Sequence, residues 1–133
     1  SQSTVHSSRL KAPLVTLFAY GRPMATSHLM TGRRGEQIAA WFLTSRGCRV
    51  IESNTTVDGD EIDLVVMDGR DRVVVEVKST TGTDDPLEAV DDHKWSRIER
   101  AASAYPRTIT RIDLVGVREG PNGVSITWLR GVH

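Results

Sequence analysis

The sequence predicts an α/β domain in which a central mixed sheet of about five strands is flanked by helices. Short apolar runs bounded by turn residues alternate with two segments of helical periodicity, in the order helix, three strands, helix, two strands (αβββαββ). Three strands joined by short turns run antiparallel, whereas a helical connection leads to a further, parallel strand. With 133 residues, the chain is long enough for one such domain and too short for two.

The first helix is expected to start at Thr31, which can act as an N-cap, and to stop at Gly47. Its apolar stripe consists of Ile38, Ala39, Phe42 and Leu43. Residues 48–54 ("CRVIESN") predict a strand, and residues 55–60 ("TTVDGD") predict a turn.

Two further strands are predicted at 61–67 and 72–79, joined by a tight turn and followed by a loop at 81–86. Residues 87–104 predict a helix with an inward apolar face and with Arg97 and Arg100 pointing outward. The inward positions of this helix are Leu87, Val90, Ile98, Ala101 and Ala102. The last strands are expected at 110–117 and 124–129, with a turn at 118–123.

Residues 1–30 are rich in Ser, Thr and Pro and lack a sustained period, which predicts a flexible tail with one short ordered piece around Leu14–Tyr20. Met24 and Met30 are both candidate starts, so part of this tail is expected to be non-native. The domain is therefore placed at 31–133.

Charge and cysteine content narrow the class of protein. The tail holds three of the 17 basic residues and none of the 17 acidic ones, so the domain itself has an acidic excess. Such an excess is not typical of a strong nucleic-acid binder. The single cysteine, Cys48, excludes an intrachain disulfide, is expected to be a small buried residue, and fits a reducing cytoplasm. No apolar run approaches the roughly 18–20 residues of a membrane span.

Charged residues interrupt the two central strands. If Gly69 and Arg70 form a two-residue loop, Asp68 pairs with Asp71, and the same register sets Asp63 directly opposite Glu76. Because side chains alternate along a strand, Lys78 shares the face of Glu76.

Two opposed carboxylates repel each other unless a cation lies between them. Mg²⁺ is commonly held by one or two carboxylates, waters and a phosphate, so Asp63 and Glu76 with the neighbouring Lys78 predict a site for phosphodiester hydrolysis. The alternative interpretation is a solvated strand face with an ordinary ion pair.

"EID" followed after twelve residues by "EVK" resembles the PD-(D/E)xK nuclease signature. Around it, "GRRGEQIAAWFLTSRGCRVIESN", "DEIDLVVMDGR", "VVVEVKS", "LEAVDDHKWSRIERAASAY" and "RIDLVGV" are similar to the YraN-type family of uncharacterised bacterial proteins. That family is regarded as endonucleases distantly akin to archaeal Holliday-junction resolvases. The resemblance implies a restriction-endonuclease-like fold and a Mg²⁺ or Mn²⁺ cofactor.

The resemblance also implies roles for single residues. Asp63 and Glu76 match the metal-binding acids, Glu36 and the backbone carbonyl of Val77 would complete the metal site, and Lys78 matches the catalytic lysine. Lys94 matches a helical lysine of the family that would meet DNA phosphate. Independently of the resemblance, a DNA-binding surface would use Arg33, Arg34, Lys94, Arg97 and Arg100, and the alternative for the arginines is a solvated helix face.

Asp113 matches a recurrent family aspartate for which a structural role is expected. Three family features are missing: an arginine after "ESN", a glycine at Asp60, and an arginine after Lys78.

Three functions therefore stay open. The first is a Mg²⁺- or Mn²⁺-dependent deoxyribonuclease acting on branched, structured or single-stranded DNA. The second is a module that binds branched DNA without cutting it, and the third is a structural or partner-binding domain. The acid–acid–lysine set favours the enzyme, and the charge balance favours the other two. A homodimer is neither required nor excluded.

Overall fold

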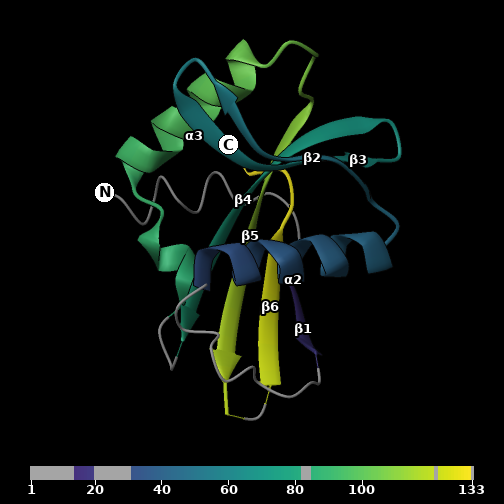
Figure 1. The fold of residues 1–133 in the computed structure, drawn as a ribbon, viewed down its shortest axis with the longest axis vertical. Coiled ribbons are helices and arrows are strands. Elements are labelled where there is room, and N and C mark those ends of the chain that lie inside the picture. The colour runs from purple at the N-terminus through teal and green to yellow at the C-terminus, as the bar shows by residue number, and fades with distance from the viewer. Residues whose placement is uncertain (1–13, 20–30, 82–84, 122, 133) are drawn as a thin grey trace.

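The computed structural model describes residues 14–19, 31–81, 85–121 and 123–132. Its centre is a six-stranded mixed sheet in the order β1-β6-β5-β4-β3-β2 (Figure 1). The strands are β1 (Leu14–Ala19), β2 (Arg49–Val57), β3 (Asp60–Asp68), β4 (Asp71–Thr81), β5 (Arg111–Gly120) and β6 (Gly123–Leu129). All neighbours are antiparallel except β4 and β5, which are parallel. The predicted α/β class is confirmed, and the arrangement is consistent with a restriction-endonuclease-like fold.

The sixth strand comes from the N-terminal segment. β1 lies where one short ordered piece was expected and pairs with β6, so the sheet includes a segment that precedes the predicted domain start at Thr31. The remainder of residues 1–30 lies outside the described residues.

One helix covers each face of the sheet (Figure 1). Helix α2 (Thr31–Ser45) packs on one face, where the Phe42 ring meets the Trp128 ring edge-on at 5.7 Å. Helix α3 (Asp92–Ala104) packs on the other face through Trp95 and Ile98. Within the described residues, none of the helices is both long and apolar enough to cross a membrane.

The stop of α2 occurs where it was predicted. Gly47 has a φ of +95°, which a residue with a side chain rarely adopts, and Cys48 N–H donates back to the Leu43 carbonyl at 3.0 Å. The Cys48 side chain is buried as expected, and burial raises the pKa of its thiol to about 11.

Two strands, β2 and β5, extend beyond their predicted ends. β2 continues through Val57, so its turn to β3 is reduced to Asp58 and Gly59, because the β-branched Thr55, Thr56 and Val57 extend the strand. β5 likewise continues to Gly120, which shortens the turn expected at 118–123.

The predicted helix at 87–104 is divided. A 3₁₀ helix, η2 (Pro86–Ala89), comes first, and α3 then starts separately after Asp91, whose carboxylate accepts the Lys94 N–H at 2.9 Å. The five residues predicted to face inward are nevertheless buried: Leu87, Val90, Ile98, Ala101 and Ala102.

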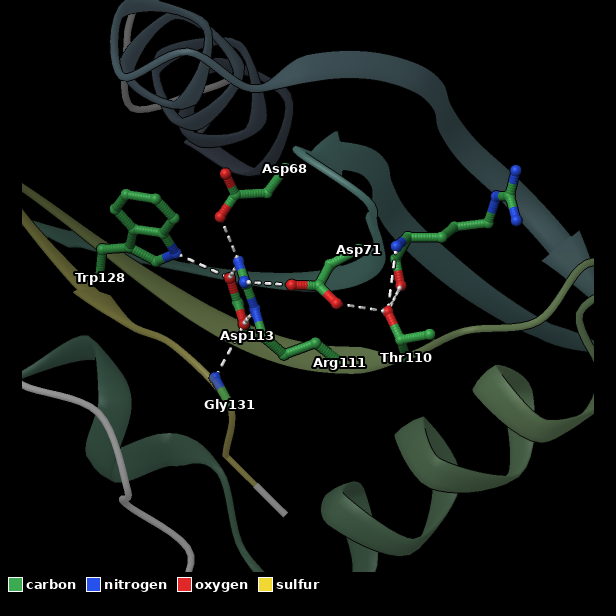
Figure 2. Close-up of polar contacts among 8 residues, drawn as sticks. Asp68, Asp71, Thr110, Arg111, Asp113, Trp128 and Gly131 are labelled. Carbon is green, nitrogen blue, oxygen red and sulfur yellow. Dashed lines mark hydrogen bonds and ion pairs between the residues drawn. The ribbon is translucent and has the colours of Figure 1, made fainter.

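Asp113 is the centre of a polar network beneath the β3–β4 turn (Figure 2). Its fully buried carboxylate accepts two N–H groups of Arg111, the Trp128 indole N–H at 2.9 Å and the Gly131 N–H at 2.9 Å. Arg111 also reaches Asp68 at 2.7 Å and Asp71 at 3.3 Å. The network ties β5, β6 and the β3–β4 turn together, which supports the structural role expected for Asp113.

Candidate functional site

The candidate site lies where β3 and β4 stop pairing. The predicted register holds from Asp68↔Asp71 to Leu64↔Val75, and Asp63 and Glu76 are the next positions along the two strands. There the Asp63 carboxylate accepts the backbone N–H of Val77 at 2.8 Å. A side chain thus takes the place of a strand partner, and the two strands separate beyond it.

Glu76 is a buried carboxylate at this gap, with 8% of its surface exposed. Burial, and then the charge of Asp63, raises the pKa of Glu76 to about 7, although the nearby Lys78 opposes the shift. The Lys78 Nζ lies 3.3 Å from the Glu76 Oε2. The raised pKa favours the protonated form of Glu76, and an added cation would favour its ionised form.

Glu36 reaches the same gap from α2. Burial and the charge of Asp63 raise the pKa of Glu36, and its Oε1 is buried without a hydrogen-bond partner among the described residues. The close approach of α2 to β4 depends on Gly35, because a Cβ there would lie 2.9 Å from the Cβ of Ser79. Asp63 of β3 is therefore close enough to interact with two other carboxylates, Glu36 from α2 and Glu76 from β4.

The sequence-based interpretation missed Asn54. This residue of β2 has a φ of +52°, and its side chain interacts with the Glu36 carboxylate and counteracts the rise in the pKa of Glu36. An asparagine within a β-branched run was the available signal, because asparagine is depleted in strands and tolerates the left-handed conformation. The sequence interpretation used it only as the end of a strand.

Helix α3 supplies cations on the open side of the gap. Hydrogen bonding with Lys78, followed by burial, lowers the pKa of Lys94, so the two amines lie side by side. Arg97 lines a cleft of about 300 Å³. The cleft is lined by Gly59, Asp60, Glu61, Asp63, Glu76, Val77, Lys78 and Arg97.

The other arginines predicted to bind DNA are placed differently. Arg34 is tied to the fold, because its Nε donates to both oxygens of Glu119 at 3.0 and 2.9 Å. Arg100 pairs with Asp60 at 3.2 Å on the rim of the cleft. Arg33 is exposed and lowers the pKa of Glu36 through its charge.

The donor set fits a hard divalent cation that is only partly enclosed by protein. Across the described parts of the chain, no group of three or more His, Cys, Asp or Glu side chains forms a ready-made metal site. Mg²⁺ nevertheless often uses one or two carboxylates and takes its other ligands from water and phosphate. A cation at this gap would provide a partner for the Glu36 Oε1, which has none among the described residues, and would counteract the raised pKa of Glu76.

The Val77 carbonyl is oriented toward the same place. Within a strand, the N–H and C=O of one residue point to the same side. Because the Val77 N–H donates to Asp63, its carbonyl also faces the gap between β3 and β4.

Comparison with known proteins places this site within a family. Residues 35–117 match the model described as "Uncharacterised protein family UPF0102". The chain belongs to the UPF0102 family. A UPF0102 protein of Arthrobacter sp. (strain FB24) is 38% identical over 112 residues, covering 77% of this chain and 95% of that protein. One from Thermotoga maritima is 36% identical over 107 residues, covering 76% and 99%.

A third UPF0102 protein, from Symbiobacterium thermophilum, is 42% identical over 100 residues, covering 69% of this chain and 85% of that protein. The family match runs from residue 35, within α2, to residue 117 in β5, so it includes Glu36, Asp63, Glu76 and Lys78. The candidate site thus belongs to the part of the chain that defines UPF0102 membership.

Proposed function

We propose that this UPF0102 protein is a metal-dependent endonuclease that hydrolyses phosphodiester bonds in branched, structured or single-stranded DNA. The observation that supports it is the crowding of Asp63 against two other carboxylates, Glu36 and Glu76. Lys78 lies 3.3 Å from the last of these carboxylates. Such crowding costs stability in a purely structural protein and is useful at a cation-dependent site.

Asp63 and Glu76 would hold the Mg²⁺ or Mn²⁺, with Glu36 and the Val77 carbonyl completing the protein ligands. A bound divalent ion in such a site polarises a phosphoryl oxygen and lowers the pKa of an attacking water. The Val77 N–H fixes the Asp63 carboxylate in one orientation, so less ordering is needed when the ligand arrives.

Lys78 and its neighbours act on the phosphate. The Lys78 amine, held beside Glu76, orients the attacking water or stabilises the negative charge that develops on the phosphate. Lys94 and Arg97, from α3, add positive charge at the cleft and bind the backbone on either side of the reacting bond. Because Arg34 and Arg100 are engaged in ion pairs, they are assigned no part in cleavage.

The test is cleavage of a panel of DNAs by the full chain with Mn²⁺ present. Four-way junctions, flaps, single strands and linear duplexes are compared, with a chelator as the negative control. The parent should cut at least one structure, and Asp63→Asn and Glu76→Gln should abolish cutting. Glu99→Gln, an exposed glutamate on α3, is the matched control and should cut like the parent. A parent that cuts none of these DNAs contradicts the proposal.

Charge distribution favours the second candidate, a non-enzymatic domain. The domain's acidic excess and the ion pairs of Arg34 and Arg100 leave few cations for a long DNA backbone. A parent that binds branched DNA without cutting it would identify a binding module. Absence of both binding and cutting would identify a structural or partner-binding domain.

A further inference from the structure

Asn54 has an unusual backbone for a residue inside a strand. Among the described residues, the non-glycine positions with positive φ are Asn54 at +52° and Asp58 at +49°. Asp58 occupies the β2–β3 turn, where such values are common, whereas Asn54 lies within β2. A left-handed residue inside a strand persists only where the surrounding structure holds it there.

The irregularity of β2 coincides with the irregularity of β3. The β2–β3 register pairs Ser53 with Leu64 and Thr55 with Ile62, which sets Asn54 across from Asp63. The ladder is interrupted at this level, and the Asp63 side chain turns to Val77 on the opposite neighbour. The backbone of β2 thus departs from the ladder at the level of the proposed metal-binding acid.

The Asn54 side chain is directed to another of these acids. It is partly buried and interacts with the carboxylate of Glu36, whose Oε1 has no hydrogen-bond partner within the described residues. We propose that Asn54 is a positioning residue whose left-handed backbone holds its side-chain amide against Glu36 and keeps that carboxylate beside Asp63. The effect of Asn54 on metal binding is the part of this inference that rests on the proposed function.

Asparagine suits both parts of this role. It tolerates the left-handed conformation better than most residues with side chains, and its side-chain NH₂ can donate a hydrogen bond to a carboxylate. Glycine would keep the backbone conformation and lose the donor. Asn54→Gly therefore separates the positioning role from the backbone conformation, and Ser53→Gly, at the exposed preceding residue, is the matched control for a glycine in β2.

The first test needs no metal. The side-chain amide resonance of Asn54, assigned by its loss in Asn54→Gly, is followed by ¹H–¹⁵N NMR in the chelator-treated full chain. It should shift in Glu36→Gln and stay in place in Glu99→Gln. If the Asn54 amide resonance does not shift in Glu36→Gln, the inference is overturned, whether or not the protein binds metal.

The second test measures Mn²⁺ affinity by calorimetry in the parent, Asn54→Gly and Ser53→Gly. Asn54→Gly should bind Mn²⁺ at least about fivefold more weakly, whereas Ser53→Gly should bind it like the parent. Equal affinities in all three proteins would contradict a positioning role at the metal site. If the parent binds no Mn²⁺, the proposed function fails, and the amide resonance alone decides whether Asn54 holds Glu36.

Discussion

The Asp63 carboxylate and the Val77 backbone N–H are joined by a hydrogen bond of 2.8 Å at the level where β3 and β4 cease to pair. An apolar side chain at position 63 would leave that N–H without this acceptor. The acid therefore opens the sheet locally and completes the hydrogen bonding of the opened strand. The gap that results is the one into which Glu36 and Glu76 bring their own carboxylates.

Replacing Asp63 with asparagine should separate its structural and metal-binding roles. Asp63→Asn keeps an oxygen for the Val77 N–H and removes the charge that raises the pKa of Glu36 and of Glu76. We expect the metal-free melting temperature to stay near that of the parent, and the rise on adding Mn²⁺ to disappear. The measurement is a thermal melt over a series of Mn²⁺ concentrations. A variant that responds to Mn²⁺ like the parent would place the cation elsewhere.

Glu76 should make stability depend on pH. Its pKa is about 7 in the folded protein against an ordinary 4.5, so the unfolded chain ionises at lower pH. The stability contributed by protonated Glu76 is complete below pH 4.5 and is lost as the pH rises through about 7. The shift in the pKa of Glu76 corresponds to a loss of at most about 3 kcal/mol.

The matching experiment is urea unfolding of the chelator-treated protein at about pH 5 and about pH 8. The free energy of unfolding should fall less between these pH values in Glu76→Gln than in the parent. Glu99→Gln should behave like the parent. The same pH dependence in Glu76→Gln and the parent would show that another group causes it.

Lys78→Ala distinguishes catalysis from charge neutralisation. If the amine acts on the water or the phosphate, the rate at saturating DNA should fall at least about tenfold, or about 1.4 kcal/mol, while DNA affinity and melting temperature change little. If Lys78 only neutralises Glu76, stability should fall instead, most clearly above the carboxylate pKa values. Arg107→Ala, at an exposed loop cation, controls for the loss of one positive charge.

Asp113→Ala should destabilise the fold strongly. It removes the acceptor of two Arg111 N–H groups, of the Trp128 indole and of the Gly131 N–H, at a fully buried position. We expect a loss of about 3–5 kcal/mol in the free energy of unfolding, measured by urea titration. Asp113→Asn keeps one of the two oxygens, so its free energy of unfolding should fall less than that of Asp113→Ala. A loss below about 1 kcal/mol for the alanine variant would contradict the structural role.

Much of the sheet could be predicted because its signals are local. The "DGRD" turn determined the register from Asp68↔Asp71 to Leu64↔Val75, and the apolar periodicity identified the buried faces of both helices. The prediction that Asp63, Glu76 and Lys78 share one end of the hairpin needed only that register and the alternation of strand side chains.

The remaining features depend on contacts between distant segments. Arg34 forms an ion pair with Glu119, a residue 85 positions away in the sequence, so its engagement could not be predicted locally. The role of Asn54 depends on its interaction with Glu36, which lies on the preceding helix α2. The sequence pattern within β2 therefore could not reveal it. The apolar pattern of residues 87–104 is continuous, so it does not reveal the break before α3. The break depends on Asp91, whose carboxylate caps α3 by accepting the Lys94 N–H.

The contact of Gly35 with Ser79 provides the last prediction. A Cβ at position 35 would lie 2.9 Å from the Ser79 Cβ, closer than packed carbons approach, so Gly35→Ala must push α2 away from β4. Glu36, the next residue, would then withdraw from Asp63. We expect weaker Mn²⁺ binding and slower DNA cleavage, with a smaller effect on melting temperature because the rest of α2 stays packed.

Ser79→Gly removes the atoms that such a Cβ would meet. Combined with Gly35→Ala, it should restore Mn²⁺ affinity to the level of Ser79→Gly alone, which is the reference because a glycine also weakens the strand. The readout is a double-mutant cycle on Mn²⁺ affinity measured by calorimetry. Additive effects of the two substitutions would mean that Gly35 acts through the helix itself, and that its contact with β4 does not set the place of Glu36.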